Sequence, residues 1–365
     1  MTDLRAPFPW FGGKRRIAHE VWAALGDVDN YVEPFFGAGA VLLERPAWHR
    51  GRVETVNDLD RYVANFWRAL SADPQGVARY ADWPVSEADL EARHLWLVTH
   101  GAELIDSMSV DPEFYDVKVA GWWVWGICSW IGSGWCSGTG PWVSDGSRMV
   151  KRQDLDSNCG QGVKRQRPHL GDAGQGVNRQ LPHLGNAGRG VNRQLPHLGT
   201  AGQGVNRQLP HLNEYLSALA DRLRSVRVCN GDWQRVTTRG AINMGTSVGV
   251  FLDPPYLGEV RCGNLYSTDD YSIANDVREW CLLNGDDPRL RIVLAGYAAE
   301  HDDLMPDTWR RVEWVGAGAY KSAVKGAEDR AKGTDANRHQ ERLWLSPACL
   351  AGGVQDRLDF GMGEL

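Results

Sequence analysis

The chain has 365 residues, which suffices for one large domain carrying an insertion or for two modest domains. Hydrophobic residues make up 42% and charged residues 24%, the balance of an ordinary globular protein. The formal net charge of −6 excludes a generally basic nucleic-acid coat, so any contact with DNA must come from a local basic region. The seven cysteines include no C-x-x-C pair, which indicates reduced thiols and neither a zinc knuckle nor a disulfide framework.

The first 70 residues predict the beginning of a doubly wound α/β sheet. Apolar residues at helical spacing predict helices at 15–25, 38–44 and 62–70, and short apolar or alternating runs predict strands at 30–33 and 52–56. This alternation of strand and helix is typical of a mostly parallel sheet.

The middle of the chain changes character. A capping box at Ser86 predicts a helix to about residue 100, and Asp111 with Pro112 predicts the start of another. Residues 119–144 carry no charge, a length that could span a bilayer. The tryptophans of this segment are spread through its middle and do not form two interfacial belts, so we expect a buried or partner-facing aromatic helix and loop and no membrane span. Such a segment favours a core or the interface of a homodimer or higher oligomer.

A repeat with a strict 14-residue period then occupies residues 160–212, with units starting at Gly160, Gly174, Gly188 and Gly202. Seven basic residues against one acid give it a local charge of +6. Its arginines could contact phosphates or base edges of DNA, and the alternative is a solvated loop of duplicated sequence. The candidate DNA-binding residues are Arg165, Arg179, Arg193 and Arg207. The repeat histidines are not at chelating spacing, so we expect no metal site.

Regular structure is expected to resume after the repeat. The pattern predicts a helix at 214–223, strands at 226–229, 247–252 and 291–295, a glycine–tyrosine turn, and a closing antiparallel pair at 310–315 and 341–345. The sheet thus starts before the insertion and finishes after it. We therefore predict a catalytic domain of residues 1–70 and 213–365 with an inserted region at 71–212.

The first motif with candidate chemistry is a glycine turn, Glu33-Pro34-Phe35-Phe36-Gly37-Ala38-Gly39, directly after a predicted strand. Such a turn lets the backbone approach a ligand at the carboxyl edge of a sheet. Asp58 follows about 20 residues later, at the end of the second strand, where an acid usually accepts hydrogen bonds from ribose hydroxyls. The alternative is a plain tight turn, and the acid at this distance favours a nucleotide site.

The second motif is Asp253-Pro254-Pro255-Tyr256, at the end of an apolar strand. An exocyclic amine is a weak nucleophile because its lone pair is delocalised into the ring. A carboxylate and a backbone carbonyl that accept its two N–H bonds would localise that lone pair. The prolines stiffen the turn and leave a carbonyl available, and the tyrosine offers a face for stacking a flipped base. The alternative is a strand-to-loop turn with a capping aspartate.

The third motif is Trp10-Phe11-Gly12-Gly13-Lys14, which suits a loop that approaches an anionic group such as a carboxylate. Along the chain, this loop comes first, the glycine turn and Asn57-Asp58 follow, and Asp-Pro-Pro-Tyr comes last. With the motifs in that order, the sequence resembles the Dam-like DNA adenine methylases over roughly 7–70 and 224–347. The resemblance implies a class I S-adenosylmethionine-dependent methyltransferase fold, Rossmann-like and mostly parallel with an antiparallel closing strand, and an inserted target-recognition region. It also implies S-adenosylmethionine as methyl donor, adenine N6 in double-stranded DNA as acceptor, and a cytoplasmic protein of prokaryotic or phage origin.

By the same resemblance, particular residues receive roles. The cofactor pocket would be lined by Trp10, Gly12, Gly13, Lys14, Glu33, Pro34, Phe35, Gly37, Gly39 and Asp58, with Asp232 and Trp233 at the cofactor's adenine ring. The catalytic residues would be Asp253, Pro254, Pro255 and Tyr256, acting by direct transfer without a covalent intermediate. Two other classes remain open: an amino-methyltransferase acting on cytosine N4, RNA or a protein amide, and a non-catalytic DNA-binding protein on the same fold.

Overall fold

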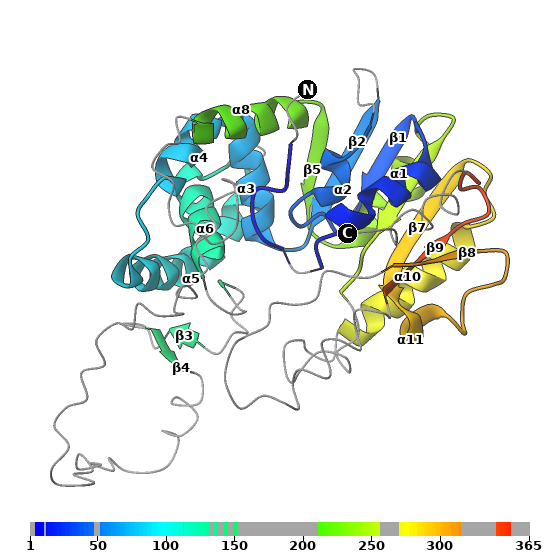
Figure 1. The fold of residues 1–365 in the computed structure, drawn as a ribbon. Coiled ribbons are helices and arrows are strands. Elements are labelled where there is room, and N and C mark those ends of the chain that lie inside the picture. Colours follow the sequence, from blue (N-terminus) through cyan, green and yellow to red (C-terminus); the bar gives the residue numbers. More distant parts are fainter. Residues whose placement is uncertain are drawn as a thin grey trace, which may run out of the picture.

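The computed structural model describes residues 4–10, 12–46, 52–111, 113–130, 135–136, 142–144, 149–151, 211–255, 270–314 and 341–351. A seven-stranded sheet in the order β5-β2-β1-β6-β7-β9-β8 forms its centre (Figure 1). The strands are β1 (Asn30–Glu33), β2 (Val53–Asp58), β5 (Val226–Asn230), β6 (Val248–Leu252), β7 (Leu290–Tyr297), β8 (Arg310–Glu313) and β9 (Glu341–Leu345). The pairs β5–β2, β2–β1, β1–β6 and β6–β7 are parallel, and β9 is antiparallel to both β7 and β8. The predicted mostly parallel sheet with an antiparallel closing strand is confirmed.

The central strands β1 and β6 are buried along their whole length. Strands in the middle of a parallel sheet are covered on both faces, so they read as continuous apolar runs without alternation. The run Val-Gly-Val-Phe-Leu of β6 is such a case, and it delivers Asp253 to the carboxyl edge of the sheet. The position of this candidate catalytic residue therefore follows from the burial of the strand that precedes it.

The sheet is accompanied by helices before, within and after the insertion. They are α1 (Ala18–Leu25), α2 (Ala40–Leu43), α3 (Arg61–Ala72), α4 (Pro74–Ala81), α5 (Glu87–Val110), α6 (Val117–Ser129), α8 (His211–Leu223), α9 (Arg239–Ile242), α10 (Asp270–Asn284) and α11 (Ala298–His301), with short 3-10 turns η1 (Arg15–Ile17) and η2 (Trp233–Val236). Figure 1 shows α3, α4, α5, α6 and α8 gathered beside β5, at one end of the sheet. A separate two-stranded sheet, β3 (Trp142–Ser144) and β4 (Met149–Lys151), belongs to the same stretch of sequence as these helices.

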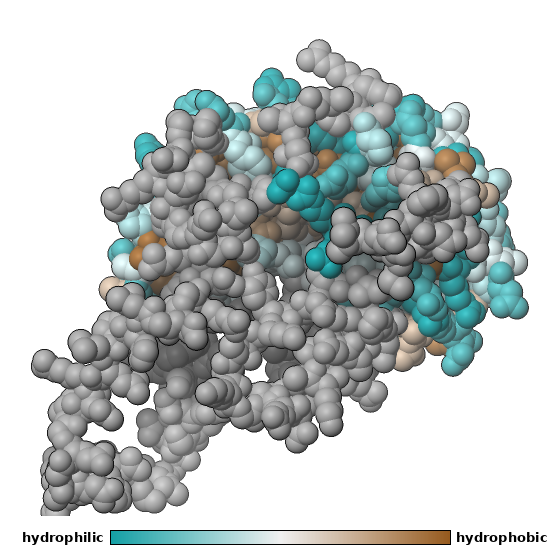
Figure 2. Space-filling view, in the orientation of Figure 1, coloured by the Kyte–Doolittle hydropathy of each residue, from teal (hydrophilic) through white to brown (hydrophobic). Residues whose placement is uncertain are grey.

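The aromatic segment forms the centre of this group of helices. Trp123 and Trp125 on α6 are buried, as the sequence predicted for this helix. Trp123 packs against Tyr62 and Phe66 of α3. No helix among the described residues is long and apolar enough to cross a membrane. On the face shown in Figure 2, the described residues are mostly hydrophilic, with hydrophobic residues in small separate patches.

Two local predictions were wrong, and one helix was not predicted. The helix from Ser86 runs on to Val110, and Asp111 ends it, because Asp111 precedes a proline in the sequence and has an extended backbone. The next helix starts at Val117 with Asp116 as its N-cap. Helix α4 was not predicted because its proline and glycine disguise the helical pattern, although Pro74 stands in the first turn, where proline is tolerated.

The predicted glycine–tyrosine turn after β7 was also wrong. Gly296 and Tyr297 belong to the strand, where they pair with Arg342 and Glu341 of β9. Pairing with a neighbouring strand thus extends β7 beyond its apolar run.

The 14-residue repeat lies mostly outside the described residues. The exception is its end, where His211 and Leu212 begin α8 and the Leu212 side chain is buried.

A buried ion-pair cluster joins α8 to the sheet. Glu54 on β2 binds Arg222 of α8 through both carboxylate oxygens, at 2.7 and 2.8 Å, and also binds Arg45 at 2.9 Å. All three side chains are almost fully buried. The chain that returns from the insertion is therefore anchored to the second strand of the sheet.

Candidate active site

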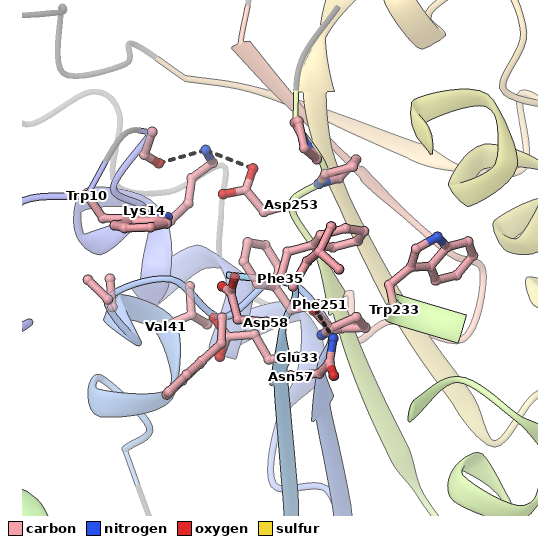
Figure 3. Close-up of a pocket in the computed structure, with 18 of the residues that line it drawn as sticks. Trp10, Lys14, Glu33, Phe35, Val41, Asn57, Asp58, Trp233, Phe251 and Asp253 are labelled. Atoms are coloured by element: carbon pink, nitrogen blue, oxygen red, sulfur yellow. Dashed lines mark hydrogen bonds and ion pairs between the residues drawn. The ribbon is translucent and has the colours of Figure 1, made fainter. Parts of the chain in front are cut away.

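A cavity opens at the carboxyl ends of β1, β2, β5 and β6, with about 240 Å³ of internal space (Figure 3). In doubly wound sheets, ligands bind outside the carboxyl ends of the strands, where the strand order reverses. Here that point lies at β1, which pairs with β2 on one side and β6 on the other. The lining residues are Trp10, Gly12, Gly13, Lys14, Glu33, Pro34, Phe35, Phe36, Ala38, Ala40, Val41, Asn57, Asp58, Leu59, Gly231, Asp232, Trp233, Phe251, Asp253, Pro254, Pro255 and Ile273.

The glycines of the turn after β1 shape the cavity without lining it. Gly37 and Gly39 have φ of +50° and +71°, a conformation that favours glycine. A Cβ on Gly37 would lie 2.4 Å from the Trp10 ring, so only glycine allows the turn and the N-terminal loop to meet this closely. The two glycines, expected among the cofactor-lining residues, are absent from the lining and instead set the backbone path behind it.

Asp58 ties the glycine turn to the end of β2. Its carboxylate accepts the N–H of Gly37 at 2.7 Å and the N–H of Asp60 at 2.8 Å. Burial, and then repulsion from Asp60, raise the pKa of Asp58 to about 7. The neighbouring Asn57 amide donates to the carbonyls of Pro34 and Gly231, which joins the loops after β1 and β5. A carboxyl group with a raised pKa therefore stands at the cavity wall.

Glu33 is a second carboxyl group of the cavity, and its side chain is buried. Its pKa is well above the usual range because of burial, reinforced by repulsion from Asp253 and Glu54, while hydrogen bonds from Tyr31 and from the Leu42 backbone act in the opposite direction. Figure 3 shows Glu33 and Asp58 near the ends of the neighbouring strands β1 and β2, and both line the cavity. This wall of the cavity suits a ligand that carries a cationic group and hydroxyl donors.

Lys14 and Asp253 join the N-terminal loop to the end of β6. The Lys14 ammonium lies 2.9 Å from Asp253 Oδ1 and donates to the Gly12 carbonyl at 2.8 Å (Figure 3). The Lys14 side chain is 3% exposed, and that of Asp253 is 19% exposed. Pro254 and Pro255 continue the lining, and Tyr256 lies outside the described residues. Two motifs separated by more than half of the chain thus meet in one cavity.

Aromatic rings close the other sides. Trp10 packs edge-on against Phe8, which in turn contacts Trp123 of α6, so the helices beside β5 help to hold the N-terminal loop. After β5, Asp232 accepts the N–H of Gln234 and Trp233 enters η2. The Trp233 ring stacks on Phe35 with 6.2 Å between the centroids.

Several lining residues were not singled out from the sequence. Phe251 belongs to the strand that carries the Asp-Pro-Pro-Tyr motif, and Asn57 stands beside Asp58, so their neighbours gave a signal that could have found them. Val41, Leu59 and Ile273 had no such signal, because only the fold brings them to the cavity.

The candidate DNA-binding residues Arg165, Arg179, Arg193 and Arg207 lie outside the described residues. Within the described ranges, no group of three or more His, Cys, Asp or Glu side chains could hold a metal ion.

The strand order, the closing antiparallel strand and the cavity at the switch point are those of a class I methyltransferase fold. The family model of the D12 class N6 adenine-specific DNA methyltransferase matches residues 10–92. The matched segment contains the N-terminal loop, the glycine turn and Asp58, and it confirms the family resemblance seen in the motifs. Asp253 lies beyond the match, and a comparison with curated proteins finds no match.

Proposed function

We propose that this protein transfers a methyl group from S-adenosylmethionine to the N6 amine of adenine in double-stranded DNA. The observation that carries the proposal is the meeting of two motifs in one cavity. The wall formed by Glu33 and Asp58 suits the methyl donor, and Asp253, at the end of β6, lines the same cavity. The matching family acts on adenine N6 in DNA, which supports the same reaction.

The residues present fit the methyl donor. Asp58 would accept hydrogen bonds from ribose hydroxyls, and Glu33 and Lys14 offer charges opposite to those of the amino and carboxylate groups of the donor's amino-acid end. Phe35 and Trp233 provide an apolar, aromatic side for the purine ring. When bound, the donor supplies an electrophilic methyl group on a sulfonium. The shape of this cavity depends on Gly37, where any side chain would collide with Trp10.

The acceptor amine needs no strong base. Asp253 and the backbone carbonyl of Pro254 would accept the two N–H bonds of the exocyclic amine, which concentrates its lone pair outside the ring. Tyr256 would stack on the adenine after rotation out of the duplex, as in other enzymes that act on a single base. Most of the rate gain would come from positioning and from matched electrostatics. Lys14, paired with Asp253, balances the charge of this carboxylate before adenine arrives.

The inserted region at 71–212 is proposed to recognise the target sequence, with the catalytic domain formed by 1–70 and 213–365. The arginines of the repeat would supply the basic surface that a chain with a net charge of −6 otherwise lacks. A cytoplasmic location and a homodimer or higher oligomer also remain proposals, the latter suggested by the tryptophan-rich segment.

The decisive experiment is transfer of a tritiated methyl group from S-adenosylmethionine to unmethylated bacterial DNA, followed by nucleoside analysis. Label in N6-methyladenine is expected. Label in N4-methylcytosine would keep the fold and the transfer chemistry and overturn the choice of base. Absence of label in any nucleoside would contradict the proposal and direct the search to RNA, protein amides or a binding role.

A further inference from the structure

Tyr31 stands next to the cavity without lining it. Because successive residues of a strand alternate between faces, Tyr31 and Glu33 lie on the same side of β1. The Tyr31 hydroxyl donates a hydrogen bond of 2.8 Å to Glu33 Oε2, and the Tyr31 side chain is completely buried. This hydroxyl therefore has a direct link to a carboxyl group that faces the ligand space.

The surroundings of Glu33 are dominated by negative charge. Asp253 from the end of β6 and Glu54 from β2 both repel an ionised Glu33, and Lys14 is already paired with Asp253. Arg45 acts on Tyr31 and is paired with Glu54. The hydrogen bonds that favour the charged form of Glu33 come from the Tyr31 hydroxyl and the Leu42 backbone N–H.

We propose that Tyr31 is a positioning residue for the methyl donor: its hydroxyl orients the Glu33 carboxylate so that Glu33 binds the cationic amino group of the donor's amino-acid end. This inference rests on the proposed function. A carboxylate buried among like charges binds a cation well only if its own orientation is already set, and a fixed hydroxyl on the same strand sets it without adding charge. Tyr31 acts only through Glu33 and touches no reacting atom.

The alternative is that Tyr31 merely fills space, since its ring packs against Trp22 at 4.7 Å. Tyr31→Phe separates the two roles because it keeps the ring and removes only the hydroxyl. Tyr62→Phe is a matched control. Tyr62 is also buried and its hydroxyl also donates a short hydrogen bond, 2.6 Å, but to the Leu97 carbonyl and away from the cavity.

The test is calorimetric binding of S-adenosylmethionine and of S-adenosylhomocysteine to the full-length wild type, Y31F, E33Q, the double variant and Y62F, between pH 6 and 9. We expect Y31F to bind both ligands about tenfold more weakly, the effect of losing one hydrogen bond to a charged group. Its KM for the donor should rise by the same factor while kcat stays near wild type. The affinity of Y31F should also reach its plateau at higher pH than that of wild type, because the hydroxyl lowers the pKa of Glu33. In the E33Q background, removing the hydroxyl should have little further effect.

Three outcomes would overturn the inference while leaving the proposed function intact: unchanged binding by Y31F, a loss in Y31F that adds fully to that of E33Q, or an equal loss in Y62F. Failure of the folded wild-type protein to bind either ligand would overturn both, because the inference rests on donor binding. Thermal unfolding of each variant without ligand shows whether it is folded. If Y31F is not folded, the donor affinity of Tyr31→Gln and Tyr31→Met replaces it: an affinity retained by Gln, whose side chain has an N–H donor, and lost by Met, whose side chain has none, supports the inference, and equal loss in both contradicts it.

Discussion

Asp253 and Asp58 face one cavity from β6 and β2, the strands on either side of β1, yet their surroundings differ. Asp253 is partly exposed and paired with the Lys14 ammonium. Asp58 is half-buried, accepts two backbone N–H groups and lies near the charge of Asp60. These differences suit different tasks: Asp253 would accept the N–H bonds of the incoming amine, and the ionisation of Asp58 would control the binding of hydroxyl donors.

Replacing Asp253 by Asn should abolish methyl transfer while leaving donor binding largely intact. The amide keeps the shape of the side chain but loses the charge that localises the lone pair of the amine. We expect a fall in kcat of at least about a hundredfold, typical of the loss of one preorganised electrostatic group. Single-turnover transfer and calorimetric donor binding measure the two effects separately. A variant that retains near-normal turnover would exclude Asp253 as the acceptor of the N6 amine.

The affinity for S-adenosylmethionine should rise with pH between about 6 and 8. Asp58 has a pKa of about 7, so it changes from the neutral acid to the carboxylate in this range. The carboxylate is the stronger acceptor for ribose hydroxyls, which sets the sign. The slope is limited to about tenfold per pH unit for a single proton. In D58N this part of the pH dependence should vanish, and a profile that persists unchanged in D58N would place the titrating group elsewhere.

At the scale of elements, the sequence pattern located the strands well because burial decides their composition. The continuous apolar runs of β1 and β6 reflect cover on both faces of the sheet. Helix α4 escaped prediction because Pro74 and Gly76 lower local helix propensity, and its stability comes from packing against α6 and α8. The length of β7 was likewise decided by its partner β9.

The anchoring of α8 gives a prediction about stability. Glu54→Gln leaves the guanidinium groups of Arg45 and Arg222 buried without their shared charge. Breaking a buried ion pair by removing one partner costs about 3–5 kcal/mol, and the free energy of unfolding should fall by that amount in urea titrations. Asp221→Asn is the control, because its ion pair with Arg224 is largely exposed and should contribute almost nothing. Equal stability of E54Q and wild type would show that hydrogen bonds, and not charge, hold α8.

At the scale of the whole molecule, charge is distributed unevenly. The repeat concentrates +6 in a chain whose total is −6, so the remainder is strongly acidic. An acidic body repels DNA, and a local basic segment would determine where the duplex docks. If the repeat is instead a solvated loop, its charge serves solubility alone.

Deleting the repeat unit at 188–201, which contains Arg189 and Arg193, separates these two interpretations. If both arginines bind phosphates, the slope of log K against log salt should become shallower by about 0.9 for each phosphate that is no longer neutralised, with kcat unchanged. The double substitution R189Q/R193Q is the control, since it removes the charge and preserves the length. Matching changes in both proteins would support binding to phosphates. Unchanged slopes in both would identify the segment as a solvated loop, and a change in the deletion alone would assign the effect to length.

The sequence by itself determined the fold class, most strands and the chemistry of three motifs. Those features are local. Burial of a strand selects a run of apolar residues, and the glycines, prolines and carboxylates of each motif lie within a few residues of one another. Only the tertiary structure decided that Lys14 meets Asp253 and that Gly37 shapes the turn beside Trp10 without lining the cavity. These interactions join segments or faces whose distance depends on how the strands are ordered and packed, and no local pattern in a single sequence encodes that order.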